Sequence, residues 1–406
     1  MYEPMLAGLR ILDFSRALAG PTCTRMLVEM GAEIIKVEAA PGGDLTRHTA
    51  KFRDNSDRSF YYVQQNRGKK SVCLDVRKPE GLALAHELVK HVDVVVENFK
   101  PGVIAEMGMG FEALKAIKPD IILCSISALG QSGPLAGKPG YDYIAQAYAG
   151  VTSMIGDPDQ PPYVPLLGLG DVSTGVHGAL AILAALRHRD RTGRGQHLDV
   201  GLLDVYYHCH EMNVITHSGT QGRVSPQRAG RHLTYMCPAG VFRASGGRDI
   251  TIMAFLHHWK DLCAAMQRPD LAADPTLDSD PKRLERRAEV IAIIETWLQG
   301  FADPAEAIAI LEAHNVPCAP VLSVAESMVE PHLVQRGTIR TIDDPLAGSF
   351  EVPGFPLRFS DFPEPLPLTA PTLGQHNDDV LTGLLGKSEE DVARLRAAGV
   401  LLERNV

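Results

Sequence analysis

The sequence lacks the cysteine arrangements that build disulfide or zinc sites. Its seven cysteines are scattered over 406 residues, and no two of them form a Cys-x-x-Cys pair. An odd number of cysteines without such spacing excludes a disulfide framework and a zinc knuckle, and indicates a reduced, cytoplasmic protein. His208 and His210 lie two residues apart and so occupy different faces of a helix. The sequence therefore predicts no metal site and no permanently bound cofactor.

Long apolar runs and an excess of positive charge are also missing. The longest apolar run, near residues 179–186, is far shorter than the ~20 residues of a membrane span. The first residues, MYEPMLAGLRILDF, have neither the basic start nor the apolar stretch of a signal peptide. The net charge of −9 argues against a general nucleic-acid binder. We expect a cytoplasmic protein that binds neither membranes nor nucleic acid, although a local basic patch could still hold a small anion.

The N-terminal part alternates between buried strands and amphipathic helices. Strand patterns at residues 9–14 and 33–38 flank a helix at residues 21–32, which implies a right-handed parallel crossover. Further strands are predicted within residues 69–76, 93–99 and 120–130, so the fold class is α/β with a large, doubly wound, Rossmann-like sheet. After the first strand the chain reads SRALAGP instead of Gly-x-Gly-x-x-Gly. This absence disfavours a nicotinamide dehydrogenase.

Composition changes along the chain predict four regions. Residues 1–200 form the large α/β domain, and residues 201–225 a linker helix and loop. Residues 226–330 read as a smaller α+β domain, with short strands around Gly246 and two amphipathic helices. Residues 331–406 form a Pro-rich, extended C-terminal arm that ends in a short helix and returns to the large domain. Such an arm more often wraps a partner or another domain than forms a core.

The stretch LLGLGDVSTGVHGALAI places Asp171 between a Gly-flanked turn and an apolar helix. An aspartate there is most simply an N-cap, because its side chain accepts N–H groups of the first turn. From spacing alone this interpretation is favoured over a catalytic role. Ser173 follows closely, but no Gly-x-Ser-x-Gly elbow is present, so a serine nucleophile is set aside.

A basic cluster stands out in this acidic chain. We give equal weight to a solvated strand edge and to an anion site. Its members are Arg67, Lys69, Lys70, Arg77 and Lys78. The motif VENFKPG carries Asn98 directly after a predicted strand, at the carboxyl edge where ligands bind to open α/β sheets. Asp13 follows another strand, where a structural role is the simpler interpretation.

The order and spacing of several motifs resemble the family III CoA transferases, the carnitine and bile-acid group that includes formyl-CoA transferase. The motifs are LAGLRILDFSRALAGPTCTRMLVEMGAEIIKVE, NRGKKSVCLDVRKPEG, DVVVENFKPG, GYDYIAQAYAG, LGDVSTGVHGALAILAALRHRDRTGRGQHLDVGLLD, VPCAPVLS and LGQHNDDVL. The resemblance covers essentially the whole chain. It implies an interlocked homodimer, in which two subunits are threaded through each other.

The resemblance also implies the chemistry and its residues. Asp171 is expected to attack an acyl-CoA thioester and to form an aspartyl anhydride and then an aspartyl-CoA thioester, from which a carboxylic acid takes the CoA. Its place at a helix N-terminus should keep it charged. CoA, as a substrate, is expected at the positions that match the family pattern. These are Leu18, Ala19, Leu74, Asp75, Val76, Arg77, Asn98, Phe99, Lys100, Lys138 and Tyr141.

Three departures from the pattern of formyl-CoA transferase bear on which substrates are expected. Leu18 stands where formyl-CoA transferase has Gln, Ala39 and Glu106 replace basic residues near the CoA phosphates, and the Gly-rich lid before MCPAGVF has no counterpart. A formyl-CoA/oxalate pair is therefore doubtful. Tyr141 stands where the related α-methylacyl-CoA racemases have a His acid/base, which disfavours an isomerase. A third alternative is a non-catalytic acyl-CoA-binding subunit, which the presence of Asp171 disfavours.

A second basic loop leads into the small domain. One of its arginines could pair with the second carboxylate of a dicarboxylic acid acceptor, because Arg forms bidentate carboxylate contacts. A solvated surface loop is the simpler interpretation. The residues concerned are Arg223, Arg228, Arg231 and His232.

Overall fold

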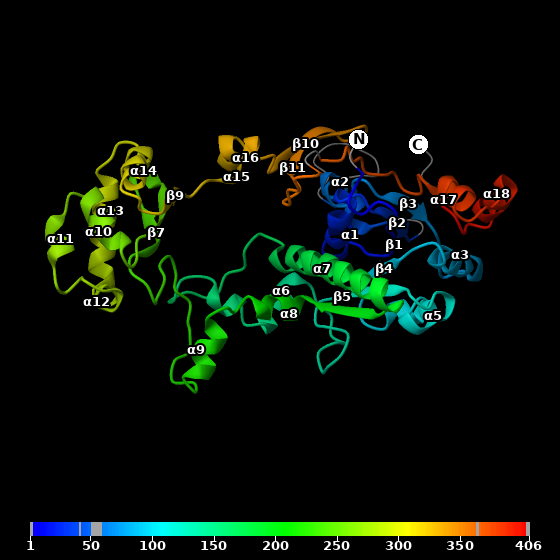
Figure 1. The fold of residues 1–406 in the computed structure, drawn as a ribbon, viewed down its shortest axis with the longest axis horizontal. Helices are drawn as coiled ribbons and strands as arrows, with labels where there is room; N and C mark the ends of the chain where they lie inside the picture. Colours follow the sequence, from blue (N-terminus) through cyan, green and yellow to red (C-terminus); the bar gives the residue numbers. More distant parts are fainter. Residues whose placement is uncertain (1–2, 40–41, 50–58, 363–364, 403–406) are drawn as a thin grey trace. The chain divides into compact units, whose positions relative to one another are not determined.

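The computed structural model describes residues 3–39, 42–49, 59–362 and 365–402. The chain forms two compact units (Figure 1). The first comprises Met1–Val151, Pro165–Glu211 and His332–Val406, and the second comprises Thr152–Val164 and Met212–Pro331. Residues 152–164, upstream of the helix that carries Asp171, therefore group with the second unit, whereas residues 165–168 belong to the first.

The first unit is built on a six-stranded parallel sheet with the order β3-β2-β1-β4-β5-β6. The strands are β1 (Arg10–Asp13), β2 (Glu33–Glu38), β3 (Lys70–Cys73), β4 (Val94–Glu97), β5 (Ile122–Ser127) and β6 (His197–Gly201). After β1 the chain adds strands on one side and then crosses to β4 on the other. The predicted parallel α/β sheet is confirmed, and its topological switch point lies between β1 and β4.

Helices cover both faces of this sheet and create two apolar cores. The first core joins the sheet to α1 (Ala19–Glu29) and α7 (Leu169–Thr192), and the second joins it to α3 (Pro79–Val89) and α5 (Phe111–Ile117). The remaining helices of this part are η1 (Leu45–His48), α2 (Phe60–Asn66), α4 (Val103–Glu106), α6 (Asp142–Tyr148) and α8 (Leu202–His208). The sheet thus has the two covered faces expected of a parallel arrangement.

Helix α7 packs unusually closely on α1. A Cβ on Gly175 would lie 2.6 Å from the Ala19 carbonyl oxygen, and one on Gly178 would lie 3.1 Å from Cys23 Sγ. Among the described residues, α7 alone has the length and hydropathy of a membrane span. Its buried side faces α1 and β5 within the first core. We therefore describe α7 as a core helix.

The C-terminal part is more structured than the predicted extended arm. Its described residues form an antiparallel hairpin and three helices, where the sequence analysis predicted a single short helix. The elements are α16 (Pro331–Gln335), β10 (Ile339–Asp344), β11 (Gly348–Pro353), α17 (Asn377–Gly383) and α18 (Glu389–Ala397). Backbone hydrogen bonds from His376 to Ser71 and from Leu402 to Cys73 fasten its end to β3. Between β11 and α17, the described residues 354–362 and 365–376 belong to no helix or named strand.

The basic cluster of the first unit is mainly a set of internal ion pairs. Arg67 is buried and pairs with Glu29 at 2.6 Å, and Lys69 is buried and pairs with Asp13 at 3.1 Å. Asp13 also accepts hydrogen bonds from Ser15 and Thr24, which confirms its structural role. Neither a solvated edge nor an open anion site describes these two cations, because each faces a buried carboxylate.

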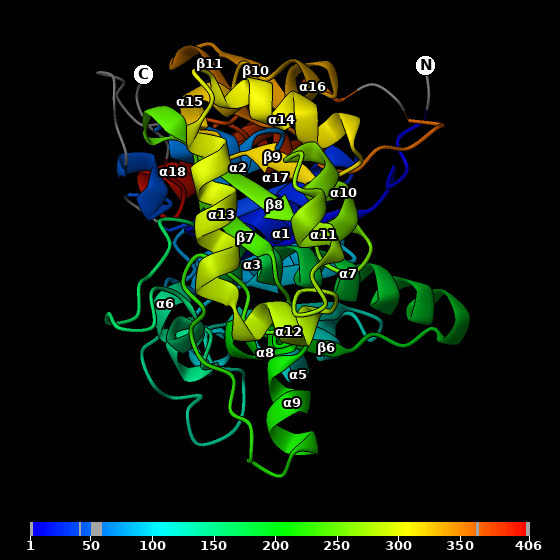
Figure 2. The same ribbon diagram turned by 90° about the vertical axis from the view of Figure 1, so that its left-hand side faces the viewer.

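The second unit is a small α+β body (Figure 2). Its sheet has the order β7-β8-β9 and is antiparallel, with β7 (Ala239–Arg243), β8 (Asp249–Met253) and β9 (Cys318–Pro320). Its helices are η2 (Thr152–Met154), α9 (Asn213–Gly219), η3 (Ser245–Gly247), α10 (His258–Ala265), α11 (Pro269–Ala273), α12 (Asp280–Glu285), α13 (Arg287–Gln299), α14 (Pro304–Ala313) and α15 (Val324–Ser327). The strands around the Gly246 turn and the two amphipathic helices α13 and α14 appear as predicted.

Candidate active site

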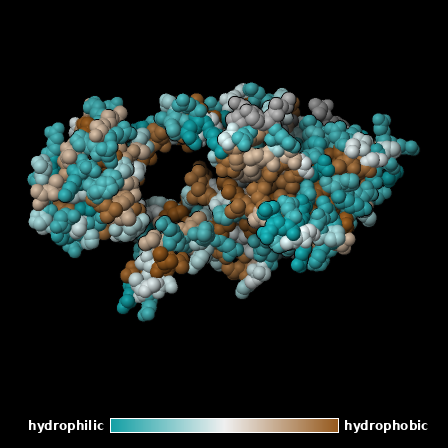
Figure 3. Space-filling view, in the orientation of Figure 1, coloured by the Kyte–Doolittle hydropathy of each residue, from teal (hydrophilic) through white to brown (hydrophobic). Residues whose placement is uncertain are grey.

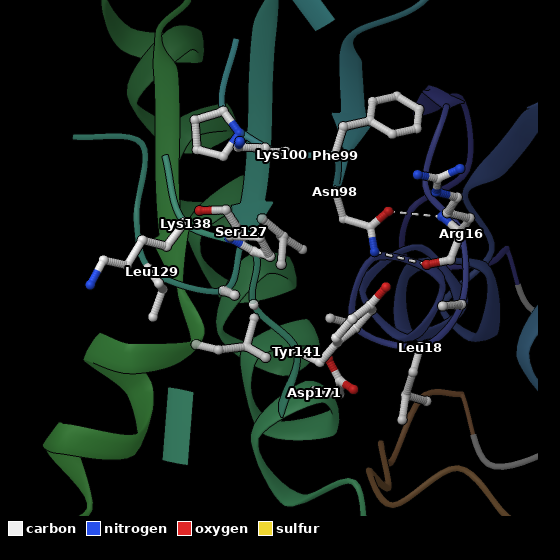
Figure 4. A pocket seen from close by; sticks show the side chains of 18 of the residues that line it. Arg16, Leu18, Asn98, Phe99, Lys100, Ser127, Leu129, Lys138, Tyr141 and Asp171 are labelled. Atoms are coloured by element: carbon white, nitrogen blue, oxygen red, sulfur yellow. Dashed lines mark hydrogen bonds between the residues drawn. The ribbon is translucent and has the colours of Figure 1, made fainter. Parts of the chain in front are cut away.

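A cavity of about 420 Å³ opens at the carboxyl ends of β1, β4 and β5 in the first unit. Its walls come from the loop after β1, from residues 98–101 after β4, and from residues 126–141 at the end of β5 and after it. Asp171, from the first turn of α7, also lines the cavity (Figure 4), as do Leu45 and Leu202. The cavity therefore lies at the topological switch point, where open α/β sheets bind their ligands.

The loop after β1 is held in place by Asn98. The Asn98 side chain accepts a hydrogen bond from the Arg16 N–H and donates one to the Arg16 carbonyl oxygen, both at 2.8 Å (Figure 4). The next residue, Ala17, has a φ of 66°, a left-handed conformation that is uncommon outside glycine. The two hydrogen bonds give Asn98 a positioning role that the sequence did not reveal.

Asp171 is the third residue of α7, not its N-cap. The helix begins at Leu169, three residues earlier than predicted, and its N-cap is Gly168, which has no side-chain oxygen to accept first-turn N–H groups. The caps come instead from other helices. Asp142 of α6 accepts the Asp171 N–H at 3.1 Å, and the Tyr206 hydroxyl of α8 accepts the Gly170 N–H at 2.9 Å. This remote cap leaves the Asp171 carboxylate free to face the cavity.

The remote cap is itself a connected network. The Tyr206 hydroxyl donates to the second oxygen of Asp142 and accepts from the Gln146 side-chain amide at 3.1 Å. The carboxylate of Asp142 is thus buried behind the nucleophile candidate with both oxygens hydrogen-bonded. Sequence reasoning missed Asp142, Gln146 and Tyr206. The D in GYD was visible, but no periodicity or spacing links residue 142 to residue 206.

Burial sets the charge state of Asp171. Its desolvation, and secondly the negative charge of Asp142, raise the pKa of Asp171 to about 7. The helix N-terminus therefore does not keep this carboxyl fully charged: with a pKa of about 7, its charged and neutral forms coexist near neutral pH. A first-turn position does favour the anion, but the buried site and the neighbouring carboxylate outweigh it. A carboxylate of this kind suits nucleophilic or proton-transfer chemistry near pH 7.

The structure brings most of the predicted CoA-binding residues together with Asp171. The residues that line the cavity are Leu18, Ala19, Asn98, Phe99, Lys100, Lys138 and Tyr141. Leu74, Asp75, Val76 and Arg77 follow the edge strand β3 and are not part of this lining. Leu74 bridges to Leu401, the Asp75 N–H binds the Val400 carbonyl, and Arg77 pairs with the Asp75 carboxylate at 2.8 Å. The CoA-binding roles of all these residues stay predictions.

Metal-ligating side chains are not grouped here. Within the described ranges, no cluster of three or more His, Cys, Asp or Glu residues could hold a metal ion. His208 and His210, in α8 and the turn after it, make other contacts. The His210 ring forms a hydrogen bond with the Ala149 carbonyl oxygen at 2.8 Å, and the His208 ring packs edge-on against His177.

The arginines proposed for an acceptor carboxylate have structural partners in the second unit. Arg228 donates to the carbonyl oxygens of Ser153, Asp157 and Gln160, at 3.0 to 3.2 Å. Arg231 pairs with Glu295 at 3.3 Å. Arg228 therefore fastens residues 152–164 to its own unit.

This clamp predicts a stability effect for Arg228→Ala. Losing three hydrogen bonds from a charged donor should lower the free energy of unfolding by about 1–2 kcal/mol. Chemical denaturation followed by circular dichroism measures it. Arg223→Ala is the matched control, because the Arg223 side chain donates to the Thr220 carbonyl at 3.2 Å alone among the described contacts; its effect should stay below about 0.5 kcal/mol. Equal effects of the two variants would contradict the clamp.

Comparison with known proteins decides the family. The model of CoA-transferase family III matches residues 6–377. The chain belongs to CoA-transferase family III. It is therefore a CoA-transferase, and the predicted resemblance is confirmed.

Several curated relatives match nearly end to end. The chain is 34% identical over 398 residues to the succinyl-CoA–D-citramalate CoA-transferase of Chloroflexus aurantiacus, covering 98% of both chains. It is 31% identical to the succinyl-CoA–L-malate CoA-transferase beta subunit of the same organism, again covering 98% of both. It is 32% identical to the formyl-CoA:oxalate CoA-transferase of Escherichia coli O157:H7, covering 96% of this chain and 98% of that one.

Solved structures of the family share the fold. A CAIB/BAIF family protein from Brucella suis superposes with a TM-score of 0.83 at 31% identity, covering 95% of this chain and 100% of that one. The Rv3272 protein of Mycobacterium tuberculosis superposes with a TM-score of 0.81 at 29% identity, covering 93% and 99%. The α/β architecture described above is therefore that of the family.

Proposed function

We propose that this CoA-transferase moves CoA from an acyl-CoA donor to a free carboxylic acid through covalent intermediates on Asp171. One observation carries the proposal: the Asp171 carboxylate faces a cavity at the sheet switch point while other helices cap its own helix. An aspartate that served only as an N-cap would have its oxygens on first-turn N–H groups.

The proposed reaction alternates between anhydride and thioester. An Asp171 oxygen attacks the donor thioester carbonyl, and CoA leaves as the thiolate. The thiolate then attacks the aspartyl carbonyl of this mixed anhydride, which releases the donor acid and leaves an aspartyl-CoA thioester. The acceptor carboxylate displaces the thiolate from that thioester, and the thiolate finally attacks the acceptor carbonyl. Acyl-CoA product and the free Asp171 carboxylate result, so each hard step is divided into easier ones.

The oxyanions that form in these steps need hydrogen-bond donors to stabilise them. The Asp171 and Gly170 N–H groups are already bound by Asp142 and Tyr206. Helix α1 begins at the cavity, and among the described residues no acceptor binds the N–H groups of Ala19 and Gly20 in its first turn. We assign these two groups, at the positive end of the α1 dipole, to the developing oxyanion. They replace the side-chain contact that Leu18 cannot make.

The assignment of substrates starts from the relatives. Two of them are named for succinyl-CoA with a hydroxy-dicarboxylic acid, and one for formyl-CoA with oxalate. We propose succinyl-CoA as donor and a dicarboxylic acid as acceptor. Three cations line the cavity and are suited to the phosphates of CoA, namely Arg16, Lys100 and Lys138.

One mass-spectrometric assay tests the function. The purified protein is incubated in D₂O with succinyl-CoA and a panel of free acids that includes citramalate, malate and oxalate. We expect CoA on a new acid and no deuterium in the acyl chain. Deuterium at the α-carbon without CoA migration would instead show an isomerase. CoA binding without either product, over a wide acid panel, would indicate a binding subunit.

The raised pKa of Asp171 predicts an acid limb in the pH profile. Only the carboxylate attacks, so kcat/KM should rise with pH through an apparent pKa near 7. Asp142→Asn removes the charge that contributes to this rise, and should move the limb to lower pH. Because the native carboxyl binds its proton more tightly than the unfolded chain, this group stabilises the fold in acid. That contribution is lost as pH rises from about 4 through about 7. An unmoved acid limb in Asp142→Asn would contradict the assigned cause.

We also propose a homodimer in the cytoplasm. Large apolar side chains of α6, α7 and the residues just before α7 are exposed in the single chain, and Figure 3 shows apolar surface gathered over the first unit. They include Tyr143, Tyr148, Leu166, Leu169, Val176 and Leu180. Contiguous apolar surface of this kind marks an interface. Mass photometry of the wild-type protein should give about twice the mass of one chain.

A further inference from the structure

Three guanidinium groups surround one carboxylate on the far side of α1 from its N-terminus. Glu29, in the last turn of α1, pairs with Arg67 at 2.6 Å and with Arg340 of β10 at 3.3 Å. Arg25 lies one helical turn before Glu29 and so shares its face of α1. Glu29, Arg67 and Arg25 are each more than nine-tenths buried. One negative charge thus stands against three positive charges, in a region with little access to water.

Arg25 is the clearest sign that this cluster is incomplete. Its Nε atom is buried and has no hydrogen-bond partner among the described residues. Burial, and secondly the charge of Arg67, lower the pKa of Arg25 to about 10. Buried charges are normally paired, because an unpaired one loses its hydration without compensation. The local excess of positive charge therefore calls for a further anion.

A second cavity of about 410 Å³ adjoins this cluster within the first unit. Glu29 and Arg340 belong to its lining, together with the guanidinium-bearing Arg336 and Arg358. The Arg358 Nη2 atom lies 3.9 Å from the position of a Cβ on Gly337, so Arg358 reaches the segment that carries Arg336. The rest of the lining is mostly apolar and aromatic, with Ile339, Phe355, Leu357, Phe359 and Phe362, and it also includes the polar Gln335.

We propose that this second cavity binds a small organic anion with an apolar or aromatic body. The anionic group would sit among Arg336, Arg340 and Arg358, with Arg25 and Arg67 adding charge from behind. The body would pack on the phenylalanine side chains. A volume of this size suits a small ligand, and Arg suits carboxylate, sulfonate or phosphate groups. The cavity that contains Asp171 shares none of these lining residues, so the proposed site is independent of the proposed catalysis.

Titration with 8-anilinonaphthalene-1-sulfonate, an aromatic anion, tests the site on the whole protein. The titration is run with saturating CoA, so that the Asp171 cavity is occupied. We expect saturable fluorescence with one site per chain. Arg336→Gln and Arg358→Gln, both at exposed positions, should each weaken binding about tenfold. Arg187→Gln, on the exposed side of α7, is the matched control and should leave binding unchanged. Competition with octanoate, 4-phenylbutyrate and AMP then separates a carboxylate ligand from a nucleotide phosphate.

Three results would overturn the proposal. The first is no saturable binding, or binding that CoA abolishes. The second is equal affinity in Arg336→Gln, Arg358→Gln and the control. The third concerns oligomerisation: if the double variant Arg336→Glu/Arg358→Glu changes the mass seen by mass photometry, these cations serve contacts between chains. None of these readouts uses CoA transfer, so failure here leaves the function of Asp171 untouched.

Discussion

Asp171→Ala is expected to lower the rate of CoA transfer by at least about 10⁴-fold. The proposed mechanism has no route around the covalent intermediates, and removal of a nucleophile costs rate on this scale. Donor affinity should change little, because the carboxylate contributes to the reaction and not to holding CoA. Stopped-time assays of CoA transfer, with acyl-CoA binding by calorimetry, measure the two effects separately.

The stability of Asp171→Ala gives an independent check. Because burial and Asp142 raise the pKa of Asp171, its charged form is disfavoured in the fold. The alanine variant should therefore unfold at the same or a higher temperature at pH 8. Asp190→Ala, at an exposed position near the end of the same helix, should retain full activity. Transfer activity that survives in Asp171→Ala would refute covalent catalysis at this residue.

Gly170→Ala is expected to reduce kcat by about 10²-fold while the protein still folds. A Cβ on Gly170 would lie 2.2 Å from Tyr206 Cε2 and 2.9 Å from Asp142 Oδ1, so Tyr206 has to move. That movement breaks the remote cap of α7 and displaces the Asp171 backbone, and a misplacement of about 1 Å can cost 10²-fold in rate. Overpacking should also cost about 1–3 kcal/mol of stability.

Two variants separate the effect of the clash from that of the cap. Tyr206→Phe keeps the ring but removes the hydroxyl that binds Gly170 and Asp142. It should therefore lower kcat less than Gly170→Ala does, and it should also shift the pH profile of kcat. Gly383→Ala adds a methyl group where no atom lies within 4 Å, and should leave kcat and stability unchanged. If Gly170→Ala behaves like Gly383→Ala, the remote cap has no catalytic importance.

Local patterns were enough to predict the large sheet. Its strands are short, apolar runs, and each is followed by a helix with a clear apolar face, so periodicity alone indicated the parallel α/β layers. The antiparallel hairpin of residues 339–353 and the helix α17 were missed. Their segments are rich in Pro and Gly and have weak periodicity, and they are stabilised by pairing with each other and with β3.

The residues of the candidate site also divide into those that the sequence predicted and those that only the folded structure shows. Asp171 and the loop positions 18, 19, 98–100, 138 and 141 could be proposed from motifs, because each motif is contiguous in the sequence. The partners of Asp171 could not, because Asp142 and Tyr206 come from two different helices and meet only when α6, α7 and α8 pack together. The raised pKa of Asp171 could not be predicted for the same reason. The helix dipole is a local property, whereas burial is a property of the whole fold.

The sequence by itself thus determined the family, the α/β class and the residue proposed to react. Only the tertiary structure decided which groups cap the helix of that residue and which charge opposes its own. It also decided which arginines form internal ion pairs. The physical reason is the range over which each interaction acts. Hydrophobic periodicity and turn chemistry act between residues close in the chain, but desolvation and charge–charge interaction depend on distances in space.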